Sequence, residues 1–254
     1  MLIDTHCHIY LEEFDKDRQE MISRAESEGV NHFLMPAIDS GSHEKLLTIE
    51  SQNPGKCLAM IGLHPCSVNE DFESELAQIE KFLLKRRFVA IGEIGLDFYW
   101  DKSKVEEQIR SFQIQIEWAL KFKLPLVIHS RDSLNECIKL VRQNQNGNLK
   151  GVFHCFSGTI DQAREITDLG FYLGIGGVVT FKNSGLDKVI KDVEMKHIVV
   201  ETDSPYLAPV PFRGKRNECS YLKYVVEKLA EIKNVAKEEV ANITTKNAKE
   251  LFNI

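Results

Sequence analysis

Residues that commonly bind metal ions recur along the sequence, each close to the end of a short apolar run. They are His6, His8, Glu93, His129, His154 and Asp203. Imidazole and carboxylate groups are common ligands of zinc, manganese and cobalt, and Mg²⁺ binds such a site with more waters. His6 and His8 are two residues apart, so on an extended chain both rings project from the same side and can bind one ion. For this pair alone the alternative is two surface histidines, and Asp4 could either orient one of them or cap the strand end.

The acids and the later histidines have more specific roles. Glu93 lies between glycines directly after an apolar run, where a carboxylate is costly unless it is paired or bound to metal. Its two oxygens could bridge two cations about 3.5 to 4 Å apart, as two-metal hydrolysis requires, and a structural salt bridge is the alternative. Asp203 lies beyond its strand and can reach an ion or accept a proton. His129 and His154 end equivalent buried runs, which favours ligands over hydrogen-bonded core histidines.

The elements that position these residues alternate regularly along the chain. Apolar runs typical of strands occupy residues 2–4, 32–36, 57–63, 88–91, 124–128, 151–154, 171–174 and 197–201. Helical patterns occupy residues 15–28, 41–51, 70–85, 102–122, 133–144, 160–169 and 186–193, followed by 218–233 and 237–252. This alternation predicts an α/β fold, a (β/α)8 TIM barrel of the metal-dependent hydrolase type, and no linker divides residues 1–254 into more than one domain. A doubly wound open sheet is the main alternative, but no glycine-rich dinucleotide motif follows the first strand.

In a barrel of this kind the carboxyl ends of the strands converge on one face, so residues far apart in the sequence can share a pocket. The proposed ligands, four neutral imidazoles and two carboxylates, carry two negative charges between them. One divalent cation would leave the site neutral, whereas two would leave it positive, and only the positive site strongly attracts phosphate. We therefore expect two divalent metal ions per chain, without a preference among Mg, Mn and Zn.

Further polar residues stand beside these ligands. His64 could bind substrate or support a ligand, or be a turn residue before proline, and we leave it outside the ligand set. Asp97 could orient a ligand, contact substrate or cap a turn, and Glu201 could support a ligand. Arg131 could bind a phosphate or pair with Asp132, and the sequence does not decide between these roles.

Composition narrows the class of protein. With 43% hydrophobic and 28% charged residues, the chain can bury a substantial core, which excludes disordered and fibrous classes. The net charge of -6 predicts no general basic surface for nucleic acid or anionic membranes, so a phosphate-bearing substrate must be attracted locally. The six cysteines form no CxxC pair, and no signal peptide or membrane-spanning run is apparent. We expect a cytoplasmic protein that does not associate with membranes.

Six short motifs, in order, resemble those of the TatD family of metal-dependent deoxyribonucleases, within the wider amidohydrolase-like barrels. The motifs are Asp4-Thr5-His6-Cys7-His8, Gly62-Leu63-His64-Pro65, Gly92-Glu93-Ile94-Gly95-Leu96-Asp97, His129-Ser130-Arg131, His154-Cys155-Phe156-Ser157-Gly158 and Glu201-Thr202-Asp203-Ser204-Pro205-Tyr206. The resemblance extends from Leu2 to about Asn247. It implies a TIM barrel whose metal centre is built from the six ligands named above.

One position departs from the family pattern. Cys219 stands where a proline is expected after a basic-Asn-Glu segment, which removes no proposed ligand. In the same loop Arg213 and Arg216 could contact phosphates, with a solvated loop as the equal alternative. Tyr99 and Trp100 could stack nucleic-acid bases or simply pack.

The resemblance implies a phosphodiester hydrolase, a 3'-5' exonuclease acting on single-stranded DNA with a metal-activated water, and we expect a monomer. In this hypothesis Glu93 bridges the ions and Asp203 takes the proton. A small-molecule amidohydrolase or lactonase on the same barrel is the first alternative, because such barrels host both chemistries. A non-catalytic metal-dependent binding module is the second, and it would not need a proton acceptor beside the metals.

Overall fold

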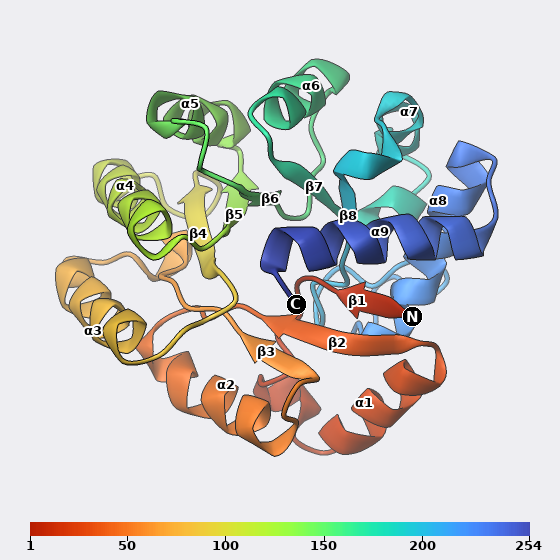
Figure 1. The fold of residues 1–254 in the computed structure, drawn as a ribbon, viewed down its shortest axis with the longest axis horizontal. Coiled ribbons are helices and arrows are strands. Elements are labelled where there is room, and N and C mark those ends of the chain that lie inside the picture. Colours follow the sequence, from red (N-terminus) through yellow and green to blue (C-terminus); the bar gives the residue numbers. More distant parts are fainter.

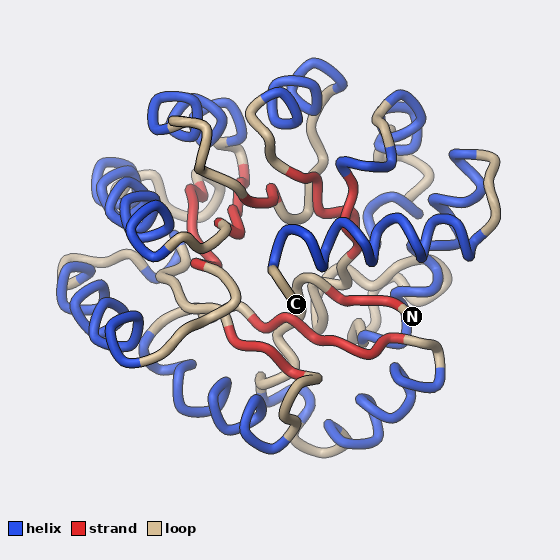
Figure 2. Tube along the Cα trace, viewed as in Figure 1, coloured by secondary structure: helices blue, strands red, loops and turns tan.

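Eight parallel strands form the inner wall of the fold, and helices surround them (Figures 1 and 2). The computed structural model describes all residues, 1–254. The strands are β1 (Leu2–Asp4), β2 (Val30–Met35), β3 (Cys57–Ala59), β4 (Ile91–Asp97), β5 (Leu126–Arg131), β6 (Gly151–Phe153), β7 (Tyr172–Ile175) and β8 (Ile198–Val200). Each strand overlaps one of the predicted runs, so the predicted order of strands is confirmed.

Two ladders make up the wall, one of β1 to β3 and one of β4 to β8. Parallel bridges join them at both seams, between Ile61 and Ile91 and between Cys7 and Ser204. At the second seam the Asp203 amide donates to the His6 carbonyl at 2.9 Å. The wall is therefore a closed ring, and the predicted TIM barrel is confirmed.

The chain has nine α-helices, and all but the last, α9, lie outside the ring (Figure 1). They are α1 (Arg18–Ser27), α2 (Ser40–Gln52), α3 (Phe72–Lys85), α4 (Val105–Phe122), α5 (Leu134–Asn144), α6 (Ile160–Asp168), α7 (Leu186–Asp192), α8 (Leu222–Lys233) and α9 (Lys237–Phe252). Capping boxes fix the starts of two of them, because Asp39 caps α2 and Thr159 caps α6 through their side chains. No helix is both long and apolar enough to cross a bilayer.

Apolar side chains close the amino-terminal end of the barrel. They belong to a buried cluster that combines strand residues with the last turns of α9: Ile3, Leu34, Met60, Ala90, Val127, Val152, Val199, Ala248, Leu251 and Phe252. Helix α9 lies across this end of the ring (Figure 1), where the Asn247 side chain donates to the carbonyls of Met195 and Ile198. The opposite, carboxyl-terminal end is left for the polar residues.

The two-residue period of a strand places polar side chains directly above this apolar floor. His129 follows Val127 by two residues on β5, and His154 follows Val152 by two residues at the end of β6. β4 extends further than the predicted run 88–91, so Glu93 lies inside the strand rather than after it. The strand register shifts between Ile91 and Ile94, as at a β-bulge, so Glu93 lies within this irregularity and Asp97 lies beyond it.

Candidate metal centre

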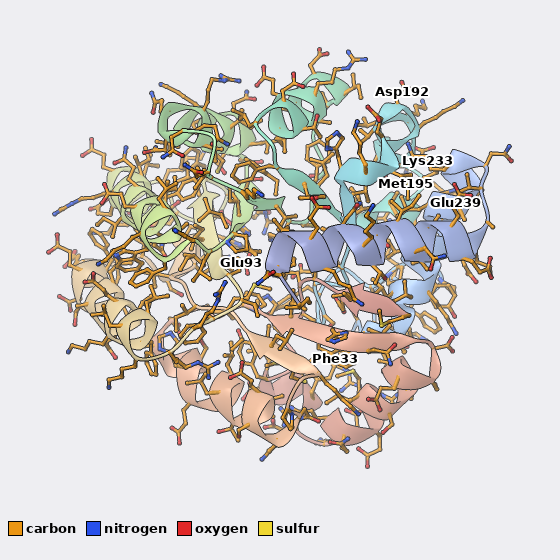
Figure 3. All side chains as sticks on the ribbon, viewed as in Figure 1. Phe33, Glu93, Asp192, Met195, Lys233 and Glu239 are labelled. Carbon is orange, nitrogen blue, oxygen red and sulfur yellow. The ribbon has the colours of Figure 1, made fainter.

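Glu93 lies within the ring of strands (Figure 3), and four of the predicted ligands surround its carboxylate. One carboxylate oxygen, Oε2, is 3.2 Å from His6 Nε2 and 3.5 Å from His8 Nε2. The other oxygen, Oε1, is 3.0 Å from His129 Nδ1 and 2.9 Å from His154 Nε2. Each oxygen therefore faces its own pair of imidazoles, and a third ring, that of His64, also approaches Oε1.

Asp203 adds a second carboxylate to the first pair. Its Oδ1 is 3.6 Å from both His6 Nε2 and His8 Nε2, and the two Nε2 atoms are 3.2 Å apart. Two ligands of one tetrahedral ion, each at its usual bond length, lie about 3.4 Å apart. The spacing of these atoms is that of ligands around a shared cation. The structure thus brings the six distant residues together, and their role as metal ligands stays a prediction.

Hydrogen bonds fix which ring nitrogens face the centre as lone pairs. The Tyr10 hydroxyl donates to the Pro36 carbonyl, so it accepts from His8 Nδ1 at 3.1 Å, and in the neutral ring His8 Nε2 carries no proton. In the same way the Asp97 carboxylate, 3.0 Å from His129 Nε2, accepts a hydrogen bond from that nitrogen, so in the neutral ring Nδ1 faces Glu93 as a lone pair. Lone pairs that converge without a donor need a cation between them, which is what a metal ion supplies.

Glu201 supports His154 from behind. Its side chain is fully buried, with Oε1 3.4 Å from His154 Nδ1, and the same oxygen accepts from the Cys155 amide at 2.5 Å. A methyl group on Gly174 would overlap Glu201 Oε2 and Cδ, so glycine is needed here to make room for the carboxylate. Glu201 therefore lies directly behind the His154 ring, and its role in orienting that ring stays a prediction.

His64 approaches the centre but presents a proton. The Cys66 amide donates to His64 Nδ1 at 3.0 Å, so in the neutral ring the proton lies on Nε2. Burial lowers the pKa of His64, which keeps the ring neutral. Its Nε2 is 3.4 Å from Glu93 Oε1, a contact in which His64 donates. Although its position would suit a ligand, its hydrogen bonding makes it a donor.

Electrostatics in the centre favour positive charge on three of the imidazoles, those of His8, His129 and His154, whose pKa values are raised. Burial raises the pKa of Glu93, but the surrounding histidines, His64 and His154 first, outweigh it and lower the pKa well below its usual value. Burial lowers the pKa of His8, but hydrogen bonds to Asp203 and Glu93 outweigh it and raise the pKa to about 9. The same carboxylates that favour a proton on these nitrogens favour a divalent ion in its place.

The Asp4 carboxylate stabilises the seam between β1 and β8 and forms no hydrogen bond to a histidine ring. Its carboxylate accepts from the Thr202 amide at 2.9 Å and from the Thr202 hydroxyl at 2.6 Å, which ties β1 to the end of β8. Burial raises the pKa of Asp4 to about 7. Cys7 and Cys219 lie close to this carboxylate and are fully buried, so the cysteine that replaces the family's proline packs against the seam.

The three predicted phosphate contacts differ in their surroundings. Arg216 is engaged by Asp17, with nitrogen to oxygen distances of 2.7 and 2.8 Å, and it also donates to the Glu13 carbonyl. This ion pair occupies the guanidinium and binds the loop after β8 to the start of α1, so Arg216 has a structural contact in place of the predicted one. Arg131 and Arg213 have no carboxylate within 4.0 Å and instead stack on aromatic rings.

Two supporting residues were missed by the sequence analysis. Tyr10 fixes the tautomer of His8, and its position two residues after His8 in the sequence was the available signal. Gly174 shapes the space for Glu201, and nothing in the local sequence indicated it. Both act through contacts that only the assembled barrel defines.

Comparisons with known proteins agree with this geometry. The family profile described as TatD related DNase matches residues 3–253. The chain belongs to the TatD family. It is 41% identical to YabD of Bacillus subtilis, named as an uncharacterized metal-dependent hydrolase, over 100% of both chains. It is 29% identical, again over 100% of both chains, to a protein of Pectobacterium carotovorum named 3'-5' ssDNA/RNA exonuclease TatD.

A solved structure of this family has the same fold. The crystal structure of YjjV, a TatD homologue from Escherichia coli, superposes with a TM-score of 0.94 at 29% identity and covers 100% of this chain and 98% of that one. The chain is therefore a metal-dependent hydrolase of the TatD family, built on a TIM barrel, with residue groups suited to metal binding at the carboxyl ends of its strands.

Proposed function

We propose that the chain is a deoxyribonuclease that hydrolyses phosphodiester bonds of single-stranded DNA from the 3' end. The observation that carries this proposal is the position of Glu93, whose two oxygens each face a separate pair of imidazoles. Such an arrangement suits two divalent ions that share one carboxylate. The name of the Pectobacterium relative supports the choice of single-stranded nucleic acid as substrate.

We assign the ligands in two groups. His6, His8 and Asp203 would hold one ion together with Glu93 Oε2. His129 and His154, both within 3.0 Å of Glu93 Oε1, would hold the other together with that oxygen. Divalent ions held there, whether Mg, Mn or Zn, would lower the pKa of a water and offset the negative charge that develops on the phosphate.

The chain's own residues supply the remaining chemistry. The Asp203 side chain is 13% exposed against 4% for Glu93, so it is the carboxylate more open to the mouth, and we assign it to accept the proton of the attacking water. His64 Nε2 carries a proton and lies 3.4 Å from Glu93 Oε1, and we assign it to donate to a phosphate oxygen in place of Glu93 when substrate is bound. Asp97 and Glu201 hold the His129 and His154 rings in place.

The test is cleavage by the purified chain, stripped of metal and resupplied with Mg, Mn or Zn in turn. We expect end-labelled single-stranded DNA to shorten from its 3' end, with slower loss of duplex. Glu93→Gln should abolish cleavage and lower metal content, whereas Glu44→Gln, on the exposed face of α2, should change neither. Intact DNA with every ion, or hydrolysis of an amide or lactone instead, would contradict the proposal.

We further propose that residues 1–254 act as one barrel domain and as a monomer in the cytoplasm. The closed ring of strands runs from the first residues of the chain to β8, and α9 returns to cover its floor. All six cysteines are free thiols, which supports a reducing compartment. A single unfolding transition and a monomer mass by light scattering are the expected results.

A further inference from the structure

Two loops at the mouth of the barrel carry most of the exposed large apolar side chains. These are Tyr99 and Trp100 after β4, and Tyr206, Leu207 and Val210 after β8, with only Met1 and Leu84 elsewhere. In a ring of eight strands β4 and β8 lie opposite each other, so the two loops face each other across the candidate metal centre. Exposed apolar side chains gathered in this way mark a binding surface.

Arg131 joins the first of these loops into one stacked unit. Its Cζ lies 3.7 Å from the centre of the Tyr99 ring and 5.2 Å from that of Trp100, and the two rings are 5.0 Å apart at an interplanar angle of 88°. No carboxylate lies within 4.0 Å of this guanidinium to neutralise it. We call these three residues, Tyr99, Trp100 and Arg131, the aromatic platform.

Asp97 connects the aromatic platform to the metal centre. Its Oδ1 accepts from the amides of Tyr99 at 2.9 Å and Trp100 at 3.3 Å, while Oδ2 lies 3.0 Å from His129 Nε2. The buried Asp97 carboxylate therefore fixes the turn that carries Tyr99 and Trp100. It also fixes the orientation of the His129 imidazole, which faces Glu93. A unit of a polymeric substrate next to the reacting phosphate would lie over this turn.

We propose that the aromatic platform binds an unpaired nucleobase next to the scissile phosphate. The base stacks on Trp100, whose side chain is 70% exposed, and Arg131 contacts the phosphate of the same nucleotide. On the opposite rim the Tyr206 ring, 6.1 Å from His8, offers a second surface. This inference rests on the proposed function, and it specifies single-stranded substrate because the base faces of a duplex are covered by their neighbours.

The main test compares Trp100→Ala with Leu84→Ala, which removes an equally exposed apolar side chain on α3. On single-stranded DNA we expect Trp100→Ala to lower kcat/KM about tenfold, the effect of losing one stacked base, and Leu84→Ala to have no effect. Trp100→Phe should restore most of the activity. On an oligonucleotide with an abasic residue at the penultimate 3' position, wild type and Trp100→Ala should be equal. Metal content should be the same in all four proteins.

A second readout does not depend on turnover. A single-stranded oligonucleotide with phosphorothioate linkages should quench the tryptophan fluorescence of the metal-loaded wild type but not that of Trp100→Phe, which retains only Trp118, 7% exposed. Equal quenching in both proteins would contradict the proposal that the aromatic platform binds a base. So would a loss of kcat/KM in Trp100→Ala that is the same on normal and abasic substrates. If the wild type binds and quenches but cleaves no DNA, the proposed reaction fails while the platform stands.

Discussion

Gly174→Ala perturbs the candidate metal centre without touching a proposed ligand. The added methyl group would overlap the Glu201 carboxylate and come within 3.0 Å of His154 Cα. Glu201 is fully buried and accepts from the Cys155 amide, so it has no free space on that side. It must retreat by about 1 Å to reach an ordinary contact distance.

The size of the effect follows from what Glu201 supports. Losing the partner of a metal-bound imidazole typically weakens metal affinity about 10- to 100-fold, and a misplacement of about 1 Å at a reactive site costs about 100-fold in rate. The overpacked methyl group should also lower the free energy of unfolding by about 1 to 3 kcal/mol. We therefore expect Gly174→Ala to weaken binding of the ion that His129 and His154 would hold, and to leave binding of the other ion unchanged.

Gly176→Ala is the matched control, because its methyl group would meet the Glu201 backbone oxygen at 3.4 Å, an ordinary contact. Metal titration calorimetry, cleavage at rising metal concentration and urea unfolding should separate the two variants. Wild-type metal affinity and turnover in Gly174→Ala would refute the role of Glu201. An equal loss in Gly176→Ala would show that the effect is not specific to the carboxylate.

Three further predictions follow from single contacts. Tyr10→Phe should weaken metal binding at His8 about tenfold in calorimetry, because the Nδ1 proton loses its acceptor. His64→Ala should leave metal content unchanged but lower kcat/KM about tenfold or more, because it removes a donor rather than a ligand. Asp17→Asn should lower the free energy of unfolding at neutral pH by about 1 kcal/mol or less, because the partly exposed pair with Arg216 is lost. The Arg216 hydrogen bond lowers the pKa of Asp17, so the stabilisation is present above the ordinary carboxyl pKa of about 3.9 and is lost as the pH falls below it.

Each of these predictions has a specific control or contrary outcome. Tyr224→Phe, on α8, should leave metal affinity unchanged. An equal loss of metal affinity in Tyr224→Phe would contradict the role of Tyr10 as the partner of His8. Loss of one ion in His64→Ala would make His64 a ligand after all. A stability difference between wild type and Asp17→Asn that persists at low pH would show that charge pairing is not its cause.

The sequence was sufficient to predict the repeat of strands and helices and which polar residues lie close together. It was not sufficient to predict the hydrogen bonds and packing that hold those residues in place. Alternation of apolar runs and helical patterns defines a barrel, and the barrel then brings His6 and Asp203 together across nearly the whole chain. Supporting contacts depend on distances that periodicity does not contain. The extension of β4 through Glu93, for example, depends on a shift of strand register, and so does the reach of Asp97 to His129.

The arginines show the same limit. Arg131 and Arg216 are indistinguishable as basic residues after barrel strands. Only the structure shows that Arg216 forms an ion pair with Asp17, the residue that precedes α1. Arg131 instead stacks on Tyr99 and has no carboxylate within 4.0 Å. A charge in a loop is therefore a weak predictor of substrate contact until its neighbours are known.

The central claim is that Glu93 is shared by two metal ions. Anomalous diffraction at the manganese edge, from crystals of the chain loaded with Mn²⁺, tests it most directly. We predict two peaks about 3.5 to 4 Å apart, one on the His6 and His8 side of the Glu93 carboxylate and one on the His129 and His154 side. A single peak, or two peaks that do not share Glu93, would contradict the claim.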